Sequence, residues 1–175
     1  GEVGASGQTI VHGLTAEDSL VINAGTGSDT LNVVASDHPI LIDGGDPIGG
    51  GTDGDTLNLL AGGASVTFNA GPEIDEGSLV AGSNEPVSYD HIESIGAFTV
   101  TGGANISGTN DADTLTIIAR EATSTPQFPG TDGLQDFTVS VNDGIEVLFV
   151  DAPSLTVDAL GGSDEITVRT PAPND

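Results

Sequence analysis

Four aspartates, each set between a glycine-containing turn and a short apolar strand, are the residues of this chain best suited to chemistry. They are Asp29, Asp55, Asp113 and Asp164. Each offers a charged oxygen ligand, and the glycines permit the left-handed backbone that turns carbonyl oxygens inward. Calcium prefers roughly six to eight such oxygens. The pattern therefore indicates calcium binding in or between these turns.

Further acids gather around the same turns. We expect the metal ligands to come from Asp29, Asp43, Asp46, Asp53, Asp55, Asp111, Asp113, Asp158 and Asp164. Asp and Gly are also common in tight turns for purely conformational reasons. That explanation suffices for scattered acids such as Asp18 and Glu121, whereas the dense group from Asp43 to Asp55 favours metal binding.

The four aspartates belong to four copies of one pattern, a strand, an acidic turn and a second strand. The copies span residues 19–33, 39–59, 104–117 and 154–168. After each aspartate, apolar and polar residues alternate, as in Leu31 with Val33 and Leu57 with Leu59, so the apolar side chains share one face of a strand. Each copy therefore predicts two short strands that point inward on either side of an outward turn.

The spacing of the copies predicts coils of about 20–29 residues. The aspartates are 26, 58 and 51 residues apart, and the two long intervals suggest coils that have lost the motif. The segment Val141–Ile145 contains Asn-Asp-Gly, which predicts a hairpin and hence an antiparallel excursion. Residues 71–86 and 122–133 are rich in Pro, Gly, Ser and Thr, and we expect them to be inserted loops.

Composition agrees with an all-β fold. The chain has 26 Gly, 9 Pro, no Cys, no Trp, one Tyr and five Phe, so a narrow stack of Val, Ile, Leu and Ala must form the core. We expect residues 1–175 to form a single all-β repeat domain, a parallel β-helix or β-solenoid with hairpin excursions, cut from a longer chain. The alternative fold is a β-sandwich.

Two of the turns resemble a known family. Residues 24–32 and 50–58 are similar to the nonapeptide G-G-x-G-x-D-x-U-x of RTX (repeats-in-toxin) calcium-binding proteins, although here the copies are never in tandem. The chain also resembles degenerate repeats of very large surface proteins of environmental bacteria. These resemblances imply a calcium-binding structural module that is extracellular or on the cell surface.

Charge narrows the set of partners. The 27 Asp and Glu face two Arg and no Lys, a formal net charge of −25. Nucleic acids and anionic membranes need cationic surfaces, so neither is an expected partner. We find no apolar run that predicts membrane insertion. Self-repulsion on this scale calls for counter-ions, either bound calcium or the high salt of a halophile, and clustering of the acids favours calcium.

We do not expect an enzyme. The β-helix fold occurs in carbohydrate-active enzymes, but lyases of this architecture need basic residues, and Arg120 and Arg169 lie in different copies. His12, His38 and His91 are scattered and suggest no triad. The expected function is a calcium-stiffened module that contacts neighbouring repeats of its parent chain. The alternative is an adhesion module that binds a glycan or a protein through residues 71–86.

Overall fold

The structure, a computed structural model, describes residue 15 and residues 18–46, 54–120 and 135–169. These residues form fifteen β-strands and no helix, which confirms the all-β prediction. The strands are β1 (Leu20–Asn23), β2 (Thr30–Val34), β3 (Ile40–Asp43), β4 (Thr56–Leu60), β5 (Val66–Ala70), β6 (Gly77–Ala81), β7 (Val87–Asp90), β8 (Ser94–Ile95), β9 (Phe98–Thr99), β10 (Ala104–Ser107), β11 (Thr114–Arg120), β12 (Gln135–Val141), β13 (Val147–Ala152), β14 (Leu155–Asp158) and β15 (Glu165–Arg169).

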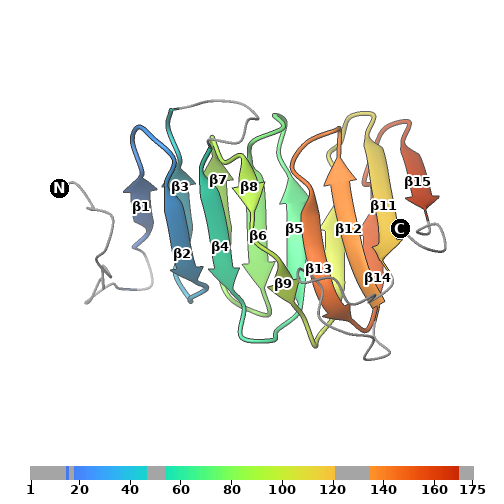
Figure 1. Ribbon diagram of the computed structural model, residues 1–175, viewed down its shortest axis with the longest axis horizontal. Helices are drawn as coiled ribbons and strands as arrows, with labels where there is room; N and C mark the ends of the chain where they lie inside the picture. The colour runs from blue at the N-terminus through green and yellow to red at the C-terminus, as the bar shows by residue number, and fades with distance from the viewer. Residues whose placement is uncertain (1–14, 16–17, 47–53, 121–134, 170–175) are drawn as a thin grey trace.

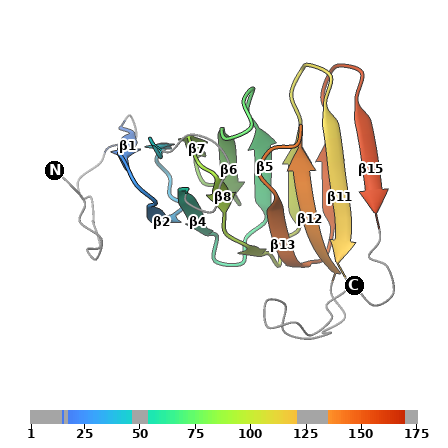
Figure 2. The same ribbon diagram turned by 45° about the horizontal axis from the view of Figure 1, so that its top comes forward.

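The strands assemble into three open sheets in two layers (Figures 1 and 2). One layer is a seven-stranded sheet of order β1-β3-β7-β6-β5-β10-β14. The opposite layer consists of a three-stranded sheet, β2-β4-β8, and a five-stranded sheet, β15-β11-β12-β13-β9. The chain passes repeatedly from one layer to the other, so consecutive copies of the sequence pattern stack along the sheets.

The two strands predicted in each of the four copies are confirmed. They are β1 and β2 in the first copy, β3 and β4 in the second, β10 and β11 in the third, and β14 and β15 in the fourth. Neighbouring copies pair in parallel, with Leu20 opposite Ile40 and Leu31 opposite Leu57. The same parallel pairing joins β10 to β14 and β11 to β15. Because register is fixed by the alternation of apolar residues, equivalent positions of the copies lie side by side.

Antiparallel excursions interrupt this parallel stacking once in each layer. In the seven-stranded sheet, β5, β6 and β7 form an antiparallel meander, and in the opposite layer β11, β12 and β13 form another. The hairpin predicted at Val141–Ile145 is confirmed: Asn142 and Asp143 have φ of 54° and 55°, and the Gly144 amide donates to the Val141 carbonyl. Positive φ at both central residues is the type I′ geometry that suits a twisted hairpin.

Two sequence predictions are wrong. Residues 71–86 are not simply an inserted loop, because they contain β6, whose Leu79 and Ala81 are fully buried. The 51-residue spacing from Asp113 to Asp164 does not make two coils, because β11 pairs directly with β15 and the extra length forms the hairpin of β12 and β13. The second predicted loop, residues 122–133, lies outside the described residues.

The core is a narrow aliphatic layer between the sheets. Its two largest fully buried side chains, Phe98 and Phe149, have ring centroids 5.7 Å apart, and most of the remainder is Val, Ile, Leu and Ala. Burial weakens toward the outermost strands: Ile166 and Val168 of β15 are 49% and 66% exposed, whereas the equivalent Leu115 and Ile117 of β11 are buried. No helix among the described residues is long and apolar enough to cross a bilayer.

Candidate metal site

Three acids occupy equivalent positions just before three neighbouring parallel strands. Asp29 precedes β2, Asp55 precedes β4 and Glu93 precedes β8, and the register of these strands places the acids next to one another. We call them the first acid stack. Each link of the stack joins a side-chain carboxylate to the backbone of the preceding member. Asp29 and Asp55 were both predicted to be metal ligands, whereas Glu93 was not.

Asp55 is the centre of the first acid stack and is completely buried. Its Oδ1 accepts a hydrogen bond of 2.7 Å from the Asp29 amide, while its own amide donates to Glu93 Oε2 at 2.6 Å. Its other oxygen, Oδ2, is buried and has no hydrogen-bond partner among the residues that the structure describes. A buried carboxylate oxygen without a partner is costly, and the usual remedies are a hydrogen-bond donor, a proton or a cation.

The surroundings of Asp55 make its negative charge unfavourable. Burial raises the pKa of Asp55 above its ordinary value, and the charges of Glu93 and Asp29 raise it further, against the lowering effect of the hydrogen bond from the Asp29 amide. Gly44 packs against the free oxygen, since a Cβ there would lie 2.6 Å from Asp55 Oδ2 and overlap the His91 carbonyl oxygen. The glycine therefore leaves just enough room for the Asp55 carboxylate.

A second row of polar groups lies beside the first acid stack, at the ends of β1, β3 and β7. Asn23, Asp43 and Asp90 occupy equivalent positions there. The Asp43 carboxylate accepts from Asn23 Nδ2 at 3.1 Å and lies 3.0 Å from His91 Nδ1. The hydrogen bond to Asp43 raises the pKa of His91, against the lowering effect of burial, and the negative charges of Asp90, Asp43 and Asp75 raise it further.

Asp113 is the counterpart of Asp55 in the other half of the molecule, and both of its carboxylate oxygens accept hydrogen bonds from protein groups. Its Oδ2 accepts from the Thr109 amide at 2.6 Å, and its Oδ1 accepts from the Thr109 hydroxyl at 2.9 Å and from Asn142 Nδ2 at 2.7 Å. Burial alone would raise the pKa of Asp113, but these three hydrogen bonds outweigh it and lower the pKa. The Asp113 amide donates in turn to Asp164 Oδ1 at 3.1 Å.

Three of the remaining predicted ligands, Asp158, Asp111 and Asp46, lie at the end of a strand or between strands. Asp158 Oδ1 accepts from the Leu160 amide at 3.0 Å, and the Asp111 amide donates to the Thr109 hydroxyl at 3.1 Å. Asp46 is exposed and its backbone bridges to the first turn, where its amide donates to the Gly25 carbonyl. Asp53 lies outside the described residues. The structure thus brings Asp29 and Asp55 together and separates both from Asp113 and Asp164, which lie in the five-stranded half.

Sequence reasoning missed several buried or linking polar residues. Glu93 completes the first acid stack without a glycine-rich turn before it, and its only signal was the apolar Ile92 and Ile95 on either side. Asp136 is 3% exposed and accepts from the Asp151 amide at 2.9 Å. Asn142 bonds both Asp113 and the Thr114 amide. These roles depend on contacts between segments far apart in the chain.

Within the described segments, no three or more His, Asp or Glu side chains converge on one point closely enough to hold a metal ion by themselves. A calcium ion at the first acid stack would therefore need backbone carbonyl oxygens besides carboxylates, which is common in calcium sites. Comparison of the chain with protein-family models, with curated protein sequences and with solved structures finds no match.

Proposed function

We propose that this domain is a calcium-binding structural module, a β-solenoid with two hairpin excursions, from an extracellular or cell-surface protein. The observation that carries the proposal is the buried Oδ2 of Asp55, which has no hydrogen-bond partner in the described part of the chain and lies in a stack with Asp29 and Glu93. A divalent cation there would pair with the Asp55 charge and reduce the repulsion among the three acids.

The donor set fits calcium better than other common metals. The first acid stack offers carboxylates and nearby backbone carbonyls, and the chain contains no Cys. Hard oxygen donors favour calcium or magnesium over zinc and copper. Calcium tolerates irregular oxygen geometry, whereas magnesium demands a near-ideal octahedron, so a site completed by backbone carbonyls in a turn favours calcium.

The stacked, parallel strand pairs support the β-solenoid interpretation. Repeat proteins of this kind depend on contacts between neighbouring coils, so a cation held between coils stiffens the whole array. Ligands that bind only the folded state add to its stability by mass action. The proposed role is therefore mechanical: calcium fixes the stacking of the coils.

Isothermal titration with calcium tests the proposal on the wild type and on Asp55→Asn. Asparagine keeps the Oδ1 acceptor for the Asp29 amide but removes the charge and the second carboxylate oxygen. We expect the variant to bind calcium at least about tenfold more weakly. Asp158→Asn, a change of the same type at an exposed turn, is the matched control and should bind like the wild type. Unchanged calcium affinity in Asp55→Asn would overturn the assignment.

A further inference from the structure

A cavity of about 240 Å³ lies where the turn between β5 and β6 meets the turn between β12 and β13. Its walls combine carboxylates with isoleucines. The acids are Asp75, Glu93, Asp143 and Glu146, and Ile74 and Ile92 are among the apolar lining residues. Three separate segments of the chain supply the acids, so the cavity exists only in the folded domain.

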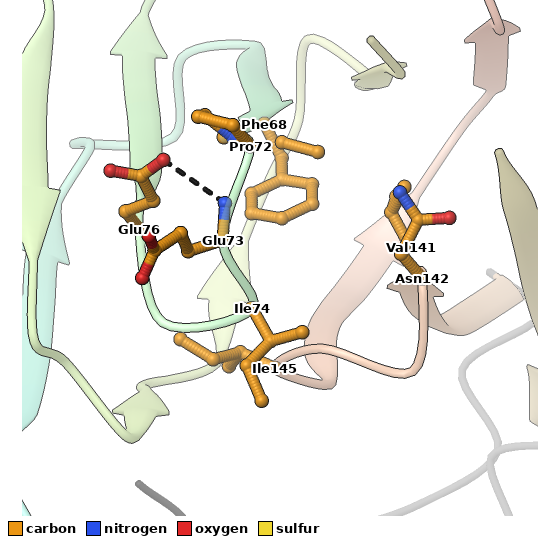
Figure 3. A pocket seen from close by; sticks show the side chains of 10 residues that line it. Phe68, Pro72, Glu73, Ile74, Glu76, Val141, Asn142 and Ile145 are labelled. Carbon is orange, nitrogen blue, oxygen red and sulfur yellow. Dashed lines mark hydrogen bonds between the residues drawn. The ribbon is translucent and has the colours of Figure 1, made fainter. Parts of the chain in front are cut away.

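The two turns are in direct contact, which fixes the shape of the cavity. A Cβ on Gly144 would lie 2.9 Å from the Ile74 carbonyl oxygen. Figure 3 shows a smaller pocket formed by the same turns, in which Ile74 lies beside Ile145 and Glu76 accepts from the Glu73 amide at 3.0 Å. The cavity walls are therefore held by packing and hydrogen bonds within both hairpins.

Asp75 is the exceptional residue of this cavity. It is 8% exposed, yet among the described residues its carboxylate has no hydrogen bond or ion pair. Its backbone is well anchored, because its carbonyl accepts from the Ile92 amide at 3.1 Å. A carboxylate that is largely buried, held in place and unpaired within the described part of the chain is a favourable partner for a cation that enters the cavity.

No Lys, Arg or His side chain is among the described residues that line the cavity. The chain has no Lys, and its two Arg belong to β11 and β15, neither of which lines the cavity. Ile92 is completely buried and Ile74 is 58% exposed, so an apolar surface runs from the interior of the cavity to its rim. Apolar walls with acids around them suit a ligand whose charged head is carried on an aliphatic stem.

We infer that this cavity binds an alkylammonium group, the chemistry shared by a lysine side chain and a free aliphatic diamine. An ammonium head has three donors that can point toward carboxylates on different segments, whereas the planar guanidinium suits a single bidentate acid. The cavity is smaller than the roughly 300–1,000 Å³ typical of drug-sized ligand sites, which fits one short chain. The site is separate from the buried Asp55 oxygen proposed for calcium, although Glu93 contributes to both.

The inference is tested by amide NMR titration with 1,4-diaminobutane and, separately, with a blocked Gly-Lys-Gly tripeptide, in saturating calcium. We expect shifts confined to residues around Asp75 and Gly144. Asp75→Asn should weaken binding at least tenfold, and Glu146→Gln, a surface change that leaves the fold intact, should weaken it about threefold. Glu73→Gln is the matched control, because Glu73 lies in the same turn but lines the other pocket.

Each arm of the experiment has a definite meaning. Tighter binding of the tripeptide identifies a lysine of a partner protein as the source, and tighter binding of the diamine identifies a free small molecule. Shifts spread over the whole acidic surface, equal weakening by Glu73→Gln, or no binding of either probe would overturn the inference. Persistence of binding in Asp55→Asn separates this site from the calcium site, so failure of one proposal leaves the other testable.

Discussion

Asp55 and Asp113 show how one residue type at equivalent sequence positions acquires opposite properties. Both are buried, but from the described residues the Asp113 carboxylate receives three hydrogen bonds and the Asp55 carboxylate receives one. The pKa of Asp55 is accordingly raised and that of Asp113 is lowered. Among the described residues, Oδ2 of Asp55 therefore has no hydrogen-bond partner, whereas both carboxylate oxygens of Asp113 accept hydrogen bonds.

Asp113→Asn should destabilise the domain by about 1–3 kcal/mol whether or not calcium is present, because one oxygen is replaced by a donor that faces other donors. Urea denaturation in EDTA and in calcium provides the measurement. A loss that appears only in calcium would assign Asp113 to a metal site instead.

The fall in the free energy of unfolding at acidic pH should depend on Asp113. Its folded-state pKa lies below the ordinary 3.8, so its ionised form favours the folded state. The stabilisation is fully present above the unfolded pKa and is lost as pH falls through the folded pKa. The difference in unfolding free energy between wild type and Asp113→Asn should therefore shrink below about pH 4. A constant difference from pH 6 to pH 2 would contradict this.

Gly44→Ala should destabilise the domain by about 1–3 kcal/mol or more, because the added methyl overlaps the His91 carbonyl oxygen and approaches Asp55 Oδ2. Gly161→Ala is the control, since its nearest neighbour would be at 3.6 Å, an ordinary contact. Melting temperatures of the two variants check the prediction. Equal melting temperatures would show that the residues around Gly44 can move enough to accept a methyl group.

At the scale of elements, Asn142 links the hairpin of β12 and β13 to Asp113 and to the start of β11. Asn142 provides one of the two left-handed turn residues and also bonds Asp113 and the Thr114 amide. Asn142→Ala should cost about 2–4 kcal/mol, because it loses both hydrogen bonds and places alanine at positive φ. Asp143→Gly should be neutral or slightly stabilising, since glycine suits its φ of 55°. Similar losses for both variants in urea denaturation would contradict this division of roles.

The strands of the four copies were predictable because local alternation specifies them. Leu57 and Leu59 alternate with polar residues and are buried, as expected. Strand β6 was missed because its alternation lies within a stretch of Gly, Ser and Pro that also suits a loop. The order of the strands could not be read from sequence, since parallel partners are chosen by contacts between distant segments.

The candidate site, like the fold, was predictable from sequence where it depends on the repeat and not where it depends on contacts between distant segments. The repeat gave Asp29 and Asp55 equivalent positions in two successive copies, and the Asp29 amide donates to Asp55 Oδ1 at 2.7 Å. The difference between Asp55 and Asp113 was not predictable, because it depends on Asn142, which lies 29 residues beyond Asp113 and comes from the hairpin. Glu93 was missed because a glutamate without a glycine turn does not match the repeat.

At the scale of the whole molecule, stability should be graded along the stack. The central strands are flanked on both sides, whereas β1, β14 and β15 are outermost and their inward residues are partly exposed. Amide hydrogen exchange should be slow in β5, β7 and β12 and at least about tenfold faster in β1 and β15. Uniform exchange across all strands would indicate a single cooperative unit instead of a stack of coils.

The measurement that tests the central claim most directly is the melting temperature in EDTA, then in calcium, magnesium and NaCl, for wild type and Asp55→Asn. At calcium about 100-fold above its dissociation constant, the wild type should gain about 2.7 kcal/mol, a rise of roughly 5–10 °C. Asp55→Asn should melt in EDTA at or above the wild-type temperature and should not respond to calcium. A wild type that responds only to NaCl, or a variant that still responds to calcium, would contradict the account of a calcium-stapled module.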